Sequence, residues 1–159
     1  MQSTRLIFEK KSKFDTAFEG KAVENLYFCS QINRNLRMIK DIILVGIGSG
    51  IGGICRYLIS LAMTQARNGF PWGTFTINVA GCLLIGILWG ATSRFQNVSP
   101  SFSLFLMVGF CGGFTTFSTF SKEGLTMLQA DSYILFSLYA IGSMMLGIMA
   151  VALGYYTTR

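Results

Sequence analysis

Polar side chains that can hold an anion occur inside segments that are otherwise apolar. Asn78 carries an amide whose two N–H groups donate hydrogen bonds without adding a competing charge. Phe117 and Phe120 are three residues apart and so share a helix face, and the edge of a phenyl ring carries partial positive charge. Hydroxyl donors accompany the two rings at Thr116, Ser118 and Thr119. Groups of these types can replace the water around a small anion.

Each of these residues also fits a simpler role in packing. A buried asparagine can simply bond to a neighbouring helix, and phenylalanines at this spacing usually pack. Tyr139 and Ser143 share a helix face, which alone indicates no more than a helix–helix hydrogen bond. Arg56 lies inside an apolar segment, where it can snorkel to the interface, cap backbone carbonyls, or attract anions to a vestibule.

The distribution of acidic residues limits the class of substrate that the protein could carry. No Asp or Glu occurs between Asp41 and Glu123, although this stretch contains four basic residues: Arg56, Arg67, Arg94 and Lys122. A cation pathway through a membrane usually needs a buried carboxylate. The acid-free stretch therefore favours an anion, a neutral substrate or no substrate. The chain also has no histidine and no visible nucleophile–base pair, so we expect no enzyme.

Four apolar segments must position these residues. Hydrophobic residues make up 52% of the chain and charged residues 13%. The apolar segments run over about 42–64, 73–93, 102–128 and 133–156. Each is close to the roughly 20 residues that cross a bilayer as a helix, and none has the polar face of a soluble bundle helix. The sequence therefore predicts an all-α membrane protein with four transmembrane helices.

Residues 1–37 differ from the rest of the chain. They are polar, mix both signs of charge, and contain seven of the thirteen basic residues. No apolar stretch follows Arg5 as it would in a signal peptide. We expect a disordered or non-native extension over 1–37 and a four-helix domain over 38–159. The basic residues in the loops of that domain only weakly favour one orientation in the membrane. The basic extension would fix the amino terminus on the cytoplasmic side.

Small residues recur inside the apolar segments. Gly46 to Gly52 contains a GxGxxG, but no acidic residue follows at the spacing of a dinucleotide site, and the apolar run continues. The pairs Gly46/Gly50 and Gly48/Gly52 instead fit close helix packing, as do Gly86/Gly90 and Ser143/Gly147. Such packing on several faces suits oligomerisation. Nothing in the sequence indicates a nucleic-acid partner.

The third apolar segment contains the least regular stretch, from Gly109 to Phe120. Its adjacent Gly112 and Gly113 are followed by two threonines, which propagate a helix poorly. A helix break at membrane depth is tolerated only where protein or a cavity surrounds it. We therefore expect a broken third helix, and freed carbonyls at such a break can coordinate a small cation.

These motifs together resemble the Fluc (CrcB) family of fluoride channels over residues 38–159. The resemblance rests on Gly-Gly-x-x-Arg-Tyr at 52–57, on Gly73-Thr74 through Asn78 and Gly81, and most specifically on 109–120. It implies an antiparallel, dual-topology dimer with two pores in the cell membrane of a prokaryote. It also implies fluoride-selective, passive export that reduces fluoride toxicity. The partner would be a second copy of the chain or a related subunit.

The resemblance also implies roles for particular residues. Asn78 resembles the pore asparagine, and Phe117 and Phe120 resemble the paired phenylalanines that border the ions. Polar pore-lining positions are matched by Ser118, Thr119, Tyr139 and Ser143. Gly112 and Thr115 resemble the carbonyl donors of a structural sodium ion on the dimer axis.

Two other classes of protein remain as alternatives. A small, dual-topology, proton-coupled multidrug exporter also has four helices, but it needs a membrane carboxylate, and the first two segments have none. A non-transporting membrane scaffold would explain the small-residue packing but not a broken third helix.

Overall fold

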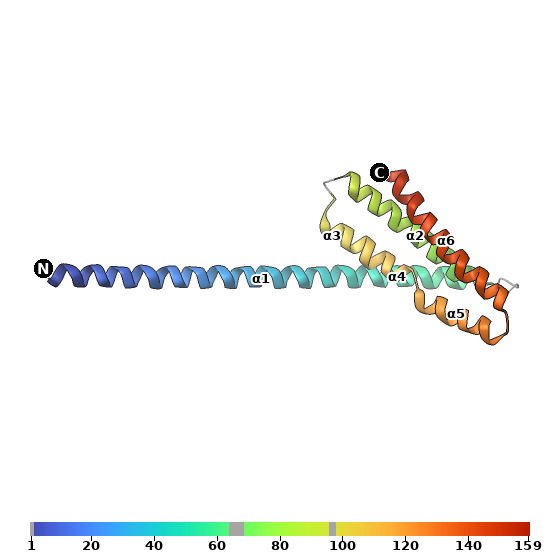
Figure 1. The fold of residues 1–159 in the computed structure, drawn as a ribbon, viewed down its shortest axis with the longest axis horizontal. Coiled ribbons are helices and arrows are strands. Elements are labelled where there is room, and N and C mark those ends of the chain that lie inside the picture. The colour runs from blue at the N-terminus through green and yellow to red at the C-terminus, as the bar shows by residue number, and fades with distance from the viewer. Residues whose placement is uncertain (1, 64–68, 96–97) are drawn as a thin grey trace. The chain divides into compact units, whose positions relative to one another are not determined.

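The computed structural model describes residues 2–63, 69–95 and 98–159, with side chains from Phe28 onward except Cys29. These residues form helices and connecting loops and contain no strand (Figure 1). The helices are α1 Gln2–Met63, α2 Trp72–Arg94, α3 Pro100–Ser103, π-helical η1 Leu104–Cys111, α4 Gly112–Phe114, α5 Phe117–Gln129 and α6 Tyr133–Thr158. The third apolar segment comprises α3, η1, α4 and α5.

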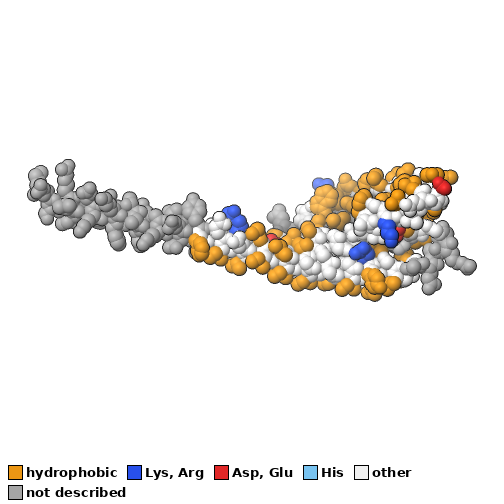
Figure 2. Space-filling model, turned by 90° about the horizontal axis from the view of Figure 1, so that it is seen from below, with side chains coloured by type: hydrophobic (Ala, Val, Ile, Leu, Met, Phe, Trp, Pro, Cys, Tyr) orange, Lys and Arg blue, Asp and Glu red, His pale blue; other side chains and the backbone are white. Residues whose placement is uncertain are grey.

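Four stretches of helix are long and apolar enough to cross a membrane. They are Ser30–Met63, Trp72–Arg94, Pro100–Gln129 and Tyr133–Thr158. Most large side chains on these helices are exposed, as for a surface that faces lipid, and Figure 2 shows hydrophobic side chains covering much of the visible face. The predicted class, an all-α membrane protein with four transmembrane helices, is therefore confirmed.

The chain divides into two compact units, Met1–Lys40 and Asp41–Arg159. This division lies close to the boundary expected after residue 37. Helix α1 begins at Gln2, so residues 2–37 lie within it, and no proline precedes Pro71 to interrupt the helix. The division into a disordered or non-native extension over 1–37 and a domain over 38–159 stays a prediction.

Helices α2 and α6 pack together backbone to backbone (Figure 1). A Cβ added at Gly86 would overlap the carbonyl of Val151 on α6, and one at Gly154 would lie 2.5 Å from the Leu83 carbonyl oxygen on α2. Only glycine permits this approach, which is the mode of association that apolar solvent favours. The contact between these two helices is extensive.

Glycines also join α1 to the third apolar segment. A Cβ at Gly48 would lie 2.6 Å from the Phe105 carbonyl oxygen, and one at Gly113 would lie 2.8 Å from the Ser49 Cα atom. Of the two pairs predicted on this helix, Gly48/Gly52 therefore packs within the chain. Gly46 and Gly50 instead face open space, with nothing within 4 Å of an added Cβ.

The third segment is broken, as predicted, within the stretch from Gly109 to Phe120. Gly112 and Gly113 stay helical within α4. The break falls at Thr115 and Thr116, whose backbones are extended, with ψ of 156° and 117°. Glycine flexibility is therefore not what ends the helix, and the cause lies in a contact made by α2.

Candidate ion-binding site

Asn78 on α2 holds the broken segment through both sides of its amide. Its Nδ2 donates to the Thr116 carbonyl at 3.2 Å, and its Oδ1 accepts from the Thr116 N–H at 2.9 Å. These two bonds replace the helical hydrogen bonds that Thr116 gives up. The helix consequently breaks at Thr116 because α2 offers its backbone a better-placed partner than the helix does. One of the two amide N–H groups of Asn78 is thus committed to structure.

Thr116 also begins α5 as its N-cap. Its hydroxyl oxygen accepts from the Thr119 N–H at 3.3 Å, and its hydroxyl lies 3.1 Å from Thr119 Oγ1 and 3.2 Å from Ser118 Oγ. Three hydroxyls therefore gather at the amino-terminal end of α5. The helix dipole makes this end electropositive, so both the hydroxyl donors and the helix terminus favour a nearby anion.

A carboxylate lies at the centre of a second polar cluster, one turn further along α5. Glu123 accepts hydrogen bonds from the Thr74 hydroxyl and the Tyr139 hydroxyl, each at 2.8 Å. Thr74 is buried and Tyr139 has no exposed surface. The cluster therefore ties α2, α5 and α6 together with two hydrogen bonds to a charged group, which are stronger than neutral ones.

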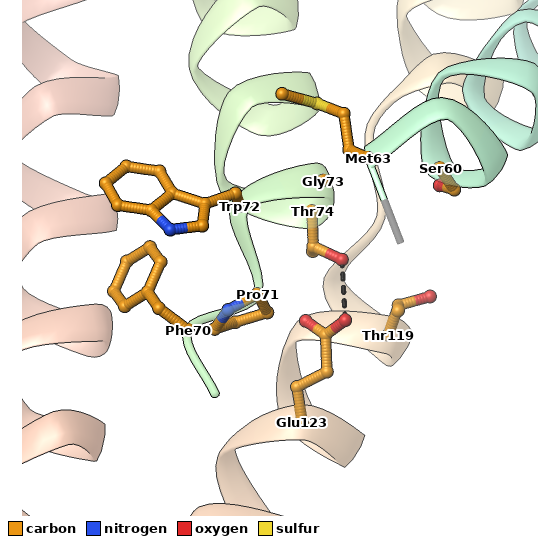
Figure 3. Close-up of a pocket in the computed structure, with 9 residues that line it drawn as sticks. All are labelled: Ser60, Met63, Phe70, Pro71, Trp72, Gly73, Thr74, Thr119 and Glu123. Atoms are coloured by element: carbon orange, nitrogen blue, oxygen red, sulfur yellow. Dashed lines mark hydrogen bonds between the residues drawn. The ribbon is translucent and has the colours of Figure 1, made fainter. Parts of the chain in front are cut away.

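A cavity of about 240 Å³ opens beside this cluster (Figure 3). Ser60, Trp72, Thr74, Thr119 and Glu123 contribute to its lining. In Figure 3 the Thr74 hydroxyl points to the Glu123 carboxylate across the cavity. The cavity therefore connects the hydroxyl cluster at the start of α5 with the carboxylate cluster.

Aromatic rings line the same region. Phe117 and Phe120 stack with their centroids 5.8 Å apart, and Phe120 lies 4.8 Å from the Tyr139 ring. Phe70 meets Tyr139 edge to face at 5.5 Å. Phe117 is 80% exposed, which is unusual for a phenylalanine at the centre of a segment unless lipid or another chain covers it.

Two predicted polar residues have buried atoms without hydrogen-bond partners among the described residues. They are Ser143 Oγ and Arg56 Nε. Ser143 lies one turn beyond Tyr139 on α6. Arg56 lies one turn before Ser60, which lines the cavity, so the two share a face of α1. Buried polar atoms are nearly always bonded, so both exceptions require an explanation.

The structure thus brings most of the predicted site residues into one region. Contacts form two groups around α5: Asn78, Ser118 and Thr119 are joined through Thr116, and Phe117, Phe120 and Tyr139 are joined through their rings. Gly112 and Thr115 lie in the same segment, immediately before α5, with Gly112 exposed. Ser143 and Arg56 lie on neighbouring turns of α6 and α1.

Two residues of the site were not singled out from the sequence. Thr74 stood within a motif without a role of its own, and Glu123 served only to mark the end of the acid-free stretch. Glu123, which ends the acid-free stretch, enters the site through its two hydroxyl partners. Its position was the available signal, since no other acidic residue occurs between Asp41 and Asp131.

The fold and the site define an integral membrane protein with a donor-rich cluster at a break in one of its spans. A family model described as CrcB-like protein, Camphor Resistance (CrcB), matches residues 43–155. The chain belongs to this CrcB-like family.

Curated relatives support the same assignment. A protein of Phocaeicola vulgatus named fluoride-specific ion channel FluC is 44% identical over 122 residues, which are 76% of this chain and 100% of the relative. A protein of the same name from Bacteroides fragilis is 45% identical over 122 residues, covering 74% of this chain and 95% of the relative. A third, from Chlorobium luteolum, is 45% identical over 119 residues, covering 75% and 92%.

Proposed function

We propose that this chain is a subunit of a fluoride-selective channel, which lets fluoride leave the cell passively and thereby limits its toxicity. The names of the relatives support fluoride as the ion. The observation that carries the mechanism is the Ser143 hydroxyl, which is buried and has no hydrogen-bond partner among the residues described. A channel of this kind catalyses no chemical reaction. It needs only a route along which the ion exchanges water for protein donors.

Fluoride is small and holds its water strongly, so the pathway must offer strong donors without binding too tightly. Asn78 has one N–H group beyond the one that bonds to Thr116, and the Ser143 hydroxyl has no partner in the part of the chain that the structure describes. Ser118 and Thr119 add hydroxyls at the electropositive start of α5. Ring edges of Phe117 and Phe120 add weak positive contacts. No fixed cation lies within this set, so the ion can also leave.

Glu123 has a positioning role in this proposal. It holds the Thr74 and Tyr139 hydroxyls between α2, α5 and α6. Two donors to one carboxylate also reduce the negative field that it exerts on an anion nearby. Arg56, one turn from the cavity lining, would attract anions toward the opening.

We further propose that the carbonyls of Gly112 and Thr115 hold a structural sodium ion. Helix α4 ends at Phe114, and carbonyls at a helix carboxyl end attract cations. The Cys111 carbonyl is already used by the Thr115 N–H and hydroxyl, whereas Gly112 borders open space. Carbonyl oxygen suits a hard cation, so the donor set fits sodium. The ion would contribute positive potential near the pathway.

The functional unit in this proposal is an antiparallel pair of chains. Gly46 and Gly50 on α1 and Gly112 on α4 have nothing within 4 Å of an added Cβ, so another backbone can approach them closely. The 80% exposed Phe117 would be covered by the same partner. The partner is a second copy of this chain or a related subunit in the opposite orientation.

Purified protein in liposomes loaded with fluoride or chloride tests the proposed activity. A potassium ionophore lets potassium leave with the anion, so that no membrane potential builds up to stop the release. An electrode selective for fluoride or for chloride then measures the ion released. We expect fluoride to leave at least roughly tenfold faster than chloride, because only the smaller ion repays its dehydration at these donors. Equal rates would contradict the selectivity. Release no faster than from protein-free liposomes would show that this chain alone forms no channel.

A further inference from the structure

The helix α1 continues well beyond the length that a membrane crossing needs. Its apolar stretch, Ser30–Met63, has 34 residues, whereas about 20 span the hydrocarbon layer. The excess lies at the amino-terminal end, because basic residues continue there up to Lys40 and the uncharged apolar run starts at Ile42. Residues Phe28–Lys40, which we call the basic segment, therefore belong at the membrane surface or beyond it.

One face of the basic segment is cationic. Arg34, Arg37 and Lys40 follow one another at intervals of three, so they share one side of the helix, and all three are exposed. No acidic residue occurs between Glu24 and Asp41. The segment therefore has three positive charges without a neutralising partner of its own.

A different face of the basic segment is apolar. Phe28, Ile32, Leu36 and Ile39 are between 42% and 66% exposed and follow at intervals of four, four and three. At about 100° per residue this stripe is centred roughly 140° around the helix from the basic residues. A helix with a basic face and an apolar face suits the boundary between headgroups and acyl chains.

We propose that the basic segment binds anionic lipid headgroups of the cytoplasmic leaflet and thereby fixes the chain with its amino terminus inside. Anionic lipid is the occupant that matches both faces, and the segment directly precedes the first span along the chain. Basic residues near the end of a first span set its orientation. The segment lies outside residues 43–155, so this property is additional to the family domain.

The basic segment decides the orientation of a chain whose other basic residues are divided almost equally between the two sides of the membrane. By the order of the four spans, Arg94 and Arg159 belong to the side of the amino terminus, whereas Arg67 and Lys122, which is near the end of the third span, belong to the other side. Arg34, Arg37 and Lys40 of the basic segment add to the inside count next to the first span. In the cell membrane, a chain of fixed orientation would pair with a related subunit inserted the opposite way, if the antiparallel assembly of the proposed function holds. In detergent no bilayer fixes the orientation, so two purified copies can still form that antiparallel pair.

Reporters fused after Arg159 test the orientation in intact bacteria. Green fluorescent protein reports a cytoplasmic carboxyl terminus and alkaline phosphatase a periplasmic one. We expect the full chain to give fluorescence alone, and Arg34→Gln/Arg37→Gln/Lys40→Gln to give both signals. The matched control, Arg34→Lys/Arg37→Lys/Lys40→Arg, keeps the charge and should behave as the unchanged chain. Both signals from the unchanged chain or the control, or fluorescence alone from the glutamine variant, would overturn the proposal.

Trypsin tests the lipid contact directly, since it cleaves after the same three residues. We expect cleavage in outward-facing copies to be at least roughly tenfold slower in vesicles with phosphatidylglycerol than in phosphatidylcholine, and high salt to abolish the difference. A soluble trypsin substrate in each sample controls for protease activity. Slow cleavage in both lipids would indicate that a second copy covers the apolar stripe. Fast cleavage in both lipids would indicate that nothing covers it. Either result overturns lipid binding. Fluoride release from the same vesicles reads the proposed function separately.

Discussion

Asn78 serves two purposes with one amide group. Its oxygen and one N–H hold the Thr116 peptide group, and its other N–H stays available to an ion. This explains why a residue that can donate and accept is placed opposite the break. A carboxylate of the same shape would keep the bond to the Thr116 N–H but face the Thr116 carbonyl with negative charge.

We therefore expect Asn78→Asp to reduce fluoride release from liposomes by about 100-fold, because it places a negative charge on an anion path. The exposed Thr76→Ser on the same helix is the matched control and should release fluoride normally. Size-exclusion chromatography in detergent checks that both variants still assemble. Flux near normal in the aspartate variant would remove Asn78 from the pathway.

A variant of Ser143 can distinguish a role of its hydroxyl in the ion pathway from a role in packing. The Ser143 hydroxyl is buried without a partner among the described residues, so Ser143→Ala removes no hydrogen bond that this part of the chain makes. Stability in detergent should change by less than about 0.5 kcal/mol, while fluoride release should fall roughly tenfold or more as one donor to a charged ligand is lost. Thermal unfolding and liposome efflux measure the two effects. A large loss of stability with unchanged flux would assign the hydroxyl to the fold.

Tyr139 should behave in the opposite way, because its hydroxyl has a partner. Tyr139→Phe leaves one oxygen of the buried Glu123 cluster without its donor and should cost about 1–3 kcal/mol of unfolding free energy. Tyr133→Phe is the matched control, since its hydroxyl bonds to Asp131 at the exposed surface and should cost little. Denaturant titration in detergent compares them. Equal costs would contradict the structural role of the Glu123 cluster.

Some residues of the candidate site could be identified from the sequence by their type, whereas Glu123 could not. Asn78, Tyr139 and the paired phenylalanines were found because amides, hydroxyls and rings are unusual at regular spacing in an apolar span. Glu123 was overlooked because it lies near the polar end of its segment, where a carboxylate normally faces water. Its hydroxyl partners come from α2 and α6, and contacts between helices so far apart in sequence leave no local pattern.

At the scale of the element, the break shows a tertiary contact overriding local propensity. The sequence located a break within Gly109–Phe120 and indicated the adjacent glycines and the two threonines after them as its cause. Gly112 and Gly113 stay helical, and the extended residues are Thr115 and Thr116. Glycine tolerates both conformations, so it cannot specify either, whereas the amide of Asn78 selects one.

Glycines that touch a backbone and glycines that face open space should respond differently to alanine. Gly86→Ala forces a Cβ against the Val151 carbonyl and should cost about 1–3 kcal/mol of unfolding free energy. Gly50→Ala meets nothing within 4 Å and should leave the single chain as stable or slightly more so. Unfolding in detergent measures both. A Gly86→Ala variant as stable as the unchanged chain would contradict the close α2–α6 packing.

At the scale of the whole molecule, the proposed sodium ion can be separated from closure of the break by protein alone. Exchange of sodium for N-methylglucamine during purification should lower fluoride release or the dimer fraction, and sodium should restore both. The reason is that unpaired carbonyls in a water-poor site cost roughly 2–7 kcal/mol. Light scattering and liposome efflux report the result. An unchanged dimer and unchanged flux would show that the break needs no ion.

The α2–α6 contact also has a consequence for how the chain is made. The two helices share an extensive contact, yet α6 follows the other described helices in the chain and leaves the ribosome after them. Until then Gly86 presents a bare stretch of backbone to lipid. A half-synthesised chain is therefore recognisable as incomplete, and membrane proteases can remove it before it reaches a partner. Truncations within α6 should shorten cellular lifetime more than their loss of a few residues suggests.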